Sequence, residues 1–203
     1  MRVSWRQWGV RWGVVALMLV SAGCATGPNA NPKDPLEPMN RSISKFNDTL
    51  DDNVLKPAAT GYRDYTPQFL QTGVSNFFRN LSDVLSMLNS GLQLKGHDTA
   101  ESFMRVTVNT VFGIYGIFDV ATPIGLERHT EDFGQTLGYW GVPNGPYLVL
   151  PVLGPSTVRD AAVLPLEFSL DPVSNHDAVA ERNAAVFTRI IDKRATLLKT
   201  TDL

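Results

Sequence analysis

EDFGQTLGYWGVPNGPYLVLPVLGPSTVRD, residues 131–160, is the most informative stretch of this chain. Gly134, Gly138 and Gly141 recur in it at positions i, i+4 and i+7, so a helix here would have one face without side chains. Such a face lets another backbone approach closely, as in helix contacts within membranes. We therefore expect this stretch to begin as a helix with one closely packed face.

Prolines and glycines end that helix, and an uncharged apolar segment follows. Pro143, Gly145 and Pro146 are helix-breaking residues, and residues 147–153 contain no charge. Ser156 then follows, and it can cap a helix that begins directly after it. Because loops normally face water, an apolar loop between two helices is unusual. Two interpretations stay open: a buried connector in a globular core, or a segment whose surroundings are partly lipid.

Length and composition narrow the class of protein. The 203 residues suffice for one domain with a sizeable core, and the 43% hydrophobic content is too low for a polytopic membrane protein. Arg2, Arg6 and Arg11 lie in an N-terminal segment without acids, so the remainder has 15 basic and 20 acidic residues, a net charge of −5. An acidic chain argues against a nucleic-acid partner. A single cysteine excludes a disulfide framework within the chain.

Residues 1–23 are typical of a signal peptide. The arginines precede an apolar run, residues 13–20, that is too short to span a bilayer. Small residues lead to Cys24, and this pattern resembles a bacterial lipoprotein processing site, so we expect Cys24 to carry a covalent lipid anchor. The alternative is a plain secretory signal cleaved near Ala22. Residues 24–33 are rich in Asn, Pro and Gly and are interpreted as a tether.

Residues 34–203 predict an all-α domain with one short apolar loop or hairpin. Apolar residues recur at steps of three and four with polar residues opposite, which is typical of amphipathic helices. The expected helices span 34–56, 57–65, 66–81, 82–94, 98–112, 157–168 and 178–198. Asp34 is the expected cap of the first, and Lys56-Pro57 its expected end. We interpret residues 111–126 as a helix end and re-entry, with a core helix as the alternative.

No catalytic or metal-binding motif is found. The sequence lacks Gly-x-Ser-x-Gly, His-Glu-x-x-His and Cys-x-x-Cys. His97, His129 and His176 lie far apart without ligand spacing, so each is interpreted as a surface or capping residue. Arg105 and Asp119 lie among apolar residues and are candidates for a buried ion pair or a helix cap. We therefore expect no catalytic residue, metal or cofactor beyond the anchor on Cys24.

Four segments resemble the MlaA/VacJ family of outer-membrane lipoproteins. They are DPLEPMNR at 34–41, GVSNFFRNL at 73–81, DFGQTLGYWGV at 132–142 and GPYLVLPVLGPSTVRD at 145–160. The resemblance that they carry spans about residues 34–160, which is most of the mature chain. The family pattern usually continues beyond the position of Leu203 with a tyrosine-containing tail.

The resemblance implies a ring of amphipathic helices around a central channel, embedded in the outer membrane on its periplasmic side. Phospholipids would leave the outer leaflet through the channel and pass to a soluble periplasmic carrier of the Mla system, while trimeric porins hold the ring. The alternatives are a structural lipoprotein that anchors porins and a lipid-degrading enzyme. We place the lipid path or gate at the turn that the glycines and prolines predict: Gly141, Pro143, Asn144, Gly145, Pro146 and Tyr147.

Overall fold

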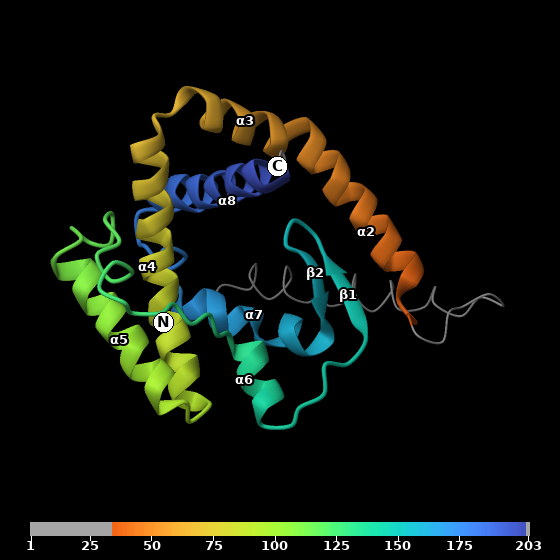
Figure 1. The fold of residues 1–203 in the computed structure, drawn as a ribbon. Coiled ribbons are helices and arrows are strands. Elements are labelled where there is room, and N and C mark those ends of the chain that lie inside the picture. The colour runs from red at the N-terminus through yellow and green to blue at the C-terminus, as the bar shows by residue number, and fades with distance from the viewer. Residues whose placement is uncertain (1–33, 202–203) are drawn as a thin grey trace, which may run out of the picture. The chain divides into compact units, whose positions relative to one another are not determined.

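The computed structural model describes residues 34–201, and these are mainly helical (Figure 1). The expected signal peptide, Cys24 and the tether lie outside the described residues. The elements are α2 (Glu37–Leu50), the π-helix η2 (Asp51–Leu55), α3 (Lys56–Tyr65), α4 (Gln68–Leu92), α5 (Gly96–Val111), α6 (Phe133–Tyr139), β1 (Tyr147–Leu150), β2 (Gly154–Thr157), α7 (Val158–Leu170) and α8 (Val179–Thr201). They form two compact units, residues 34–48 with 144–158 and residues 49–143 with 159–201.

The first unit contains a β-hairpin formed by the apolar segment. β1 and β2 pair antiparallel, with Tyr147 opposite Thr157. The expected cap Ser156 is therefore wrong, because Ser156 lies in β2 and α7 begins at Val158. The hairpin is not a wholly buried connector, since Val149 is buried but Val152 at its tip is exposed.

Two asparagines of α2 bind the edge of β1 that β2 leaves free. Asn40 donates to the carbonyl of Tyr147 at 3.1 Å and accepts from the N–H of Val149 at 2.8 Å. Asn47, two helical turns later on the same face, donates to the carbonyl of Leu150 at 2.9 Å. The side-chain amides thus satisfy backbone groups that an edge strand would otherwise leave unpaired.

The second unit is a helical assembly in which α4 and α5 lie side by side and α8 packs against α3 and α4 (Figure 1). Its apolar core is small and lies between α3 and α8. The core consists of Ala59, Ile191, Ala195 and Leu198, with Leu55, Ala58 and Tyr62 packed around it. The short helix expected at 57–65 is confirmed as α3.

Two expected helix boundaries are wrong because the helix tolerates the residues that suggested them. Pro57 does not end a helix, since the π-helix η2 continues directly into α3 and Pro57 lies near the point where they join. Ser82 does not start a helix, because its hydroxyl bonds the carbonyl of Phe78 at 3.0 Å within the continuous α4.

The chain turns sharply between α4 and α5. Leu94 takes a positive φ of 59° there, and Gly96, expected to break a helix, begins α5 instead. Asp98 is therefore in the first turn of α5 and not at its cap. After Val111 the chain forms turns up to residue 132, so the expected helix end is confirmed and the alternative of a core helix is wrong. In α7, Pro165 lies inside the helix without stopping it.

None of the helices within residues 34–201 combines the length and the apolar character that crossing a membrane requires.

Candidate functional site

Helix α4 turns its polar residues inward and much of its apolar surface outward. Its buried residues are Gln71, Phe78, Asn80, Asp83, Ser86, Asn89 and Ser90. Its exposed large apolar residues are Phe69, Leu70, Leu88 and Leu92. A helix on the surface of a protein in water shows the opposite pattern. Such an inverted helix is typical of proteins that meet a membrane or an apolar partner.

Helix α5 and the turns after it repeat this inversion. The buried residues of α5 are Ser102, Arg105 and Asn109. The exposed apolar residues here are Phe103, Met104, Val111, Phe112, Ile114, Tyr115, Ile117, Phe118 and Ile124. An apolar surface on this scale is typical of contact with a membrane or a protein partner.

The apolar turns are held in a defined conformation. Ile114, Tyr115 and Gly116 all have positive φ, which is rare for a β-branched residue such as isoleucine. The N–H of Gly116 donates to the carbonyl of Asn109 at 2.9 Å, and Asn76 of α4 donates to the carbonyl of Ile117 at 3.1 Å. Polar side chains thus fix a backbone that directs apolar side chains outward.

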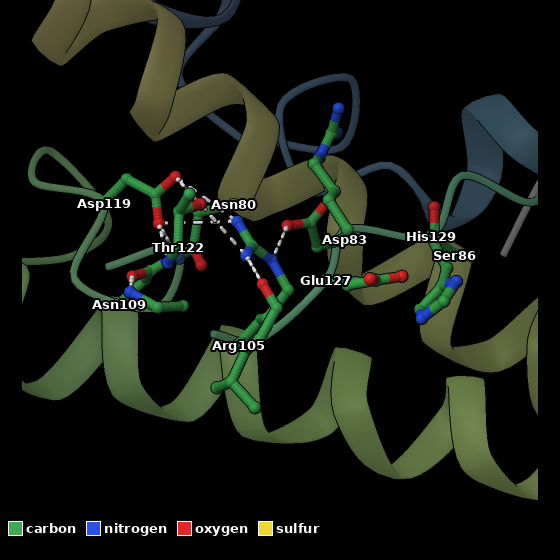
Figure 2. Close-up of polar contacts among 12 residues, drawn as sticks. Asn80, Asp83, Ser86, Arg105, Asn109, Asp119, Thr122, Glu127 and His129 are labelled. Carbon is green, nitrogen blue, oxygen red and sulfur yellow. Dashed lines mark hydrogen bonds and ion pairs between the residues drawn. The ribbon is translucent and has the colours of Figure 1, made fainter. Parts of the chain in front are cut away.

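Arg105 lies at the centre of the inward polar residues and is 3% exposed (Figure 2). Its guanidinium donates to the hydroxyl of Thr122 at 3.2 Å and to the carbonyl of Leu126 at 2.5 Å. It also lies 3.4 Å from Asp119 and 3.8 Å from Asp83. The ion pair that the sequence suggested between Arg105 and Asp119 is therefore confirmed.

The two carboxyls beside Arg105 have opposite pKa shifts. Asp83 is 2% exposed, and burial raises its pKa although Arg128, 2.7 Å away, and Arg105 act in the opposite direction. Burial also acts to raise the pKa of Asp119, but hydrogen bonds from Thr122 and the charge of Arg105 lower it on balance. One carboxyl is thus shifted toward its neutral form, and the other stays ionised.

A polar cavity of about 230 Å³ adjoins this cluster. Its lining residues are Asn76, Arg79, Asn80, Asp83, Arg105, Asn109, Asp119, Thr122 and Arg128. The Oδ1 of Asn80 and the Nε of Arg105 are buried without a protein hydrogen-bond partner within residues 34–201. The cavity is therefore suited to a polar group, and Asn80 offers it an unpaired acceptor.

Arg79 lies between this cavity and a second polar one. The second has a volume of about 140 Å³ and includes Asn76, Asp192 and Lys199 in its lining. Arg79 is exposed and makes no hydrogen bond or ion pair within the described part of the chain, unlike Arg105 and Arg128. Its charge is thus available to an anionic group.

An apolar groove of about 940 Å³ also runs along α4 and α5. Its lining residues include Met87, Leu88, Leu92, Phe103, Phe133 and Leu170. Helices α4 and α5 therefore line one polar cavity and an apolar groove, and the second polar cavity is lined by α4 and α8.

The first part of residues 131–160 is hydrogen-bonded to the polar face of α4. Thr136 of α6 donates to Asn89 at 2.7 Å, and Gln93 donates to Glu131 at 2.9 Å. Asp132 caps α6 through the N–H of Gln135 at 2.6 Å. These contacts position the segment that leads into the predicted gate.

The glycine face predicted for this helix is confirmed at two of its three positions. A Cβ at Gly134 would meet the side chain of Asp160, and one at Gly138 would meet that of Arg159. The close neighbours are thus side chains and not another backbone. Gly141 does not belong to the face, because α6 ends at Tyr139 and Gly141 has a φ of +88°.

The predicted gate, residues 141–147, is exposed throughout. Gly141 and Gly145 have φ of +88° and +69°, backbone positions that a Cβ disfavours. Pro143 is the last residue of one compact unit and Asn144 the first of the other. The role of Gly141, Pro143, Asn144, Gly145, Pro146 and Tyr147 in a lipid path stays a prediction.

The interpretation of the histidines as three separate residues is wrong for two of them. The rings of His97 and His129 lie 6.4 Å apart, because the chain after α5 returns to the first turn of that helix. His176 lies elsewhere and pairs with Glu181 at 2.9 Å.

The inward polar set was not predicted as a site. A signal for it exists, since Asp83, Ser86, Asn89 and Gln93 recur at steps of three, three and four along the chain. The prediction of this helix rested on the apolar residues of its opposite face.

Comparison with known proteins identifies the family. A sequence model of the MlaA lipoprotein family matches residues 32–203. The intermembrane phospholipid transport system lipoprotein MlaA of Escherichia coli K12 is 39% identical over 144 residues, which are 68% of this chain and 57% of that protein. A protein of Rickettsia typhi is 42% identical over 127 residues, 63% of this chain and 51% of that one. The chain thus spans about half the length of these relatives.

A solved structure supports the same conclusion. It comes from work on the structural basis for maintenance of bacterial outer membrane lipid asymmetry, and it matches 82% of this chain and 85% of its own with a TM-score of 0.71 and 35% identity. The chain belongs to the MlaA lipoprotein family.

Proposed function

We propose that this chain is an outer-membrane lipoprotein that removes phospholipids from the outer leaflet through a polar path and passes them to a periplasmic carrier. The observation that carries the proposal is the inversion of α4 and α5, with buried polar and exposed apolar residues. Such helices can rest their apolar faces in one leaflet while their polar faces accept a headgroup. Family membership supports the same function.

The cavities suggest how one phospholipid is held. Its phosphate carries a negative charge, and Arg79 is an exposed cation between two polar cavities. Its acyl chains match the apolar groove along α4 and α5. Arg105 and Asp83 shape the path without serving as ligands, because each is engaged with other protein charges.

Arg79→Glu tests this arrangement in protein purified with its bound lipid. We expect less co-purified phospholipid than in wild type, because the free cation becomes an anion. Lys193→Glu on the exposed side of α8 is the matched charge reversal and should retain wild-type lipid content. Equal lipid content in both variants would contradict a headgroup contact at Arg79.

The predicted gate is tested separately, by surface-exposed phospholipid in cells. Gly141→Arg and Asn144→Arg should alter lipid flux more than protein level, because both positions are exposed and a large charged side chain there would obstruct a passing lipid. Lys193→Glu again serves as the control. Loop variants that are stable and move lipid like wild type would leave residues 141–147 as a connector only.

The anchor on Cys24 is part of the proposal. Cys24→Ala should leave an unacylated and mislocalised precursor, detected by mass spectrometry and membrane fractionation. An unmodified Cys24 in the wild-type protein would overturn it.

The partners and the passive mechanism are proposed as well. We expect trimeric porins to hold the chain in a ring of helices around a channel, and a soluble carrier of the Mla system to receive the lipid.

Replacing His97, His129 and His176 together by Gln should leave lipid handling nearly intact, whereas loss of function in a folded variant would favour a lipid-degrading enzyme. Purified protein without bound phospholipid would favour a lipoprotein that only anchors porins.

A further inference from the structure

Two histidines and an aspartate meet at the start of α5. His97 and Asp98 lie in its first turn, and His129 lies in the segment that leads to α6. One ligand atom from each of the three residues lies within 4.8 Å of the others. Imidazole and carboxylate groups are common ligands of divalent transition metals.

The orientation of the three side chains fits a shared cation. The Nδ1 of His97 lies 3.5 Å from one oxygen of Asp98, and the Nδ1 of His129 lies 3.9 Å from the other. Bond lengths of about 2.0–2.2 Å to Zn²⁺ place tetrahedral ligand atoms about 3.4 Å apart, so small side-chain rotations suffice. His97 has freedom to rotate, because its side chain is 84% exposed.

Glu101 provides a second, independent observation. Its carboxylate lies 2.8 Å from the Nε2 of His129, and it also accepts the N–H of Glu127 at 2.7 Å. The other ring nitrogen of His129, Nδ1, faces Asp98 at 3.9 Å. A carboxylate behind one nitrogen of a histidine is the usual support of a ring that binds a metal through the other nitrogen.

We propose that His97, Asp98 and His129 bind a divalent transition-metal ion, with Zn²⁺ as the best match, and that Glu101 is a positioning residue for His129. The three ligands leave a fourth position for water. A bound ion would join the first turn of α5 to the segment that carries α6. The proposal does not depend on the transport function.

The test uses the full chain, purified in detergent without a polyhistidine tag and stripped of metal. Calorimetric titration with ZnCl₂ should show one ion per chain, and bound Zn²⁺ should raise the thermal midpoint. His97→Ala, Asp98→Asn and His129→Ala should each abolish tight binding. Glu101→Gln should retain binding but weaken it about tenfold or more, as for other groups that support a ligand.

His176→Ala is the matched control, because His176 also pairs with a carboxylate, Glu181, but stands apart from the cluster. It should bind Zn²⁺ like wild type. If His129→Ala fails to fold, Zn²⁺ binding by His97→Ala tests the site instead, since the exposed ring of His97 is not needed for packing. The proposal is overturned if wild type shows no stoichiometric binding, or if binding and the rise in thermal midpoint persist in His97→Ala. In that case the three side chains form no metal site.

Discussion

Replacing Arg105 by Met should destabilise the second unit, because it removes the central cation of its polar interior. The substitution keeps a long apolar stem but deletes the guanidinium that contacts Thr122, the carbonyl of Leu126 and Asp119. It also leaves Asp83 with Arg128 as its cation. Methionine has no group that can replace these contacts.

The expected loss of stability depends on whether Asp83 and Asp119 keep another cation or contact with water. Breaking a buried ion pair costs about 3–5 kcal/mol. The lower end applies here, because Asp83 retains Arg128 and the side chain of Asp119 is 30% exposed. We therefore expect about 3 kcal/mol, or a fall of about 6–12 °C in the thermal midpoint for a chain of this size.

Thermal unfolding in detergent, followed by circular dichroism, measures the effect. Arg41→Met is the matched control, since Arg41 forms an exposed i,i+4 pair with Glu37 that should be worth about 0.3–0.5 kcal/mol. Hydrogen exchange should also accelerate in residues 119–126, which Arg105 ties to α5. Adding Asp119→Asn to Arg105→Met should recover part of the loss, because it removes an unpaired charge.

A midpoint for Arg105→Met within a degree or so of wild type would refute this reasoning. So would an equal loss in Arg41→Met, because the two arginines would then contribute alike despite their different burial.

Three further changes test other parts of the structure. Burial, followed by the charge and hydrogen bond of Asp192, raises the pKa of Tyr62 to about 12, so this group's contribution to stability is complete below pH 10 and is lost between pH 10 and 12. Asp192→Asn should lower that pKa, as read from tyrosinate absorbance against a Tyr62→Phe blank; an unchanged titration would contradict it. Gly116→Ala should lower the free energy of unfolding, measured with denaturant, more than Gly125→Ala does. Both glycines have φ near +88°, but only a Cβ at Gly116 would also contact Asn80. Gly125→Ala alone should cost about 1–2 kcal/mol, and equal losses would exclude the Asn80 contact as a cause. Asn40→Ala should speed amide exchange in β1, and unchanged protection would show that the strand edge does not need this side chain.

Local pattern was sufficient for much of the helical structure. The predicted ranges of α3 and α8 agree closely with the structure, and the glycines and the proline after Val111 predicted the end of α5 there. The predicted helix boundaries were wrong where a residue type can occur both at a helix end and within a helix. Pro57 can end a helix or lie in its first turn, and Ser82 can cap a helix or bond within one.

The hairpin shows why the rest needed the tertiary structure. A short apolar loop or hairpin was expected here, but Ser156 has good capping chemistry and residues 154–157 show no alternating pattern of their own, so only the pairing with β1 identifies the second strand. The same holds for the histidines, which sequence spacing separated and the fold brought together.

The sequence by itself determined the family, the helical class and the amphipathic faces, and it marked Arg105 and Asp119 as candidates for an ion pair. Only the tertiary structure decided which face of α4 and α5 is the inside. Periodicity shows that a helix has two faces, but not which solvent each one meets. That choice follows from the neighbours: α5 and the turns after it supply hydrogen-bond partners to the polar face of α4 and leave its apolar side chains exposed.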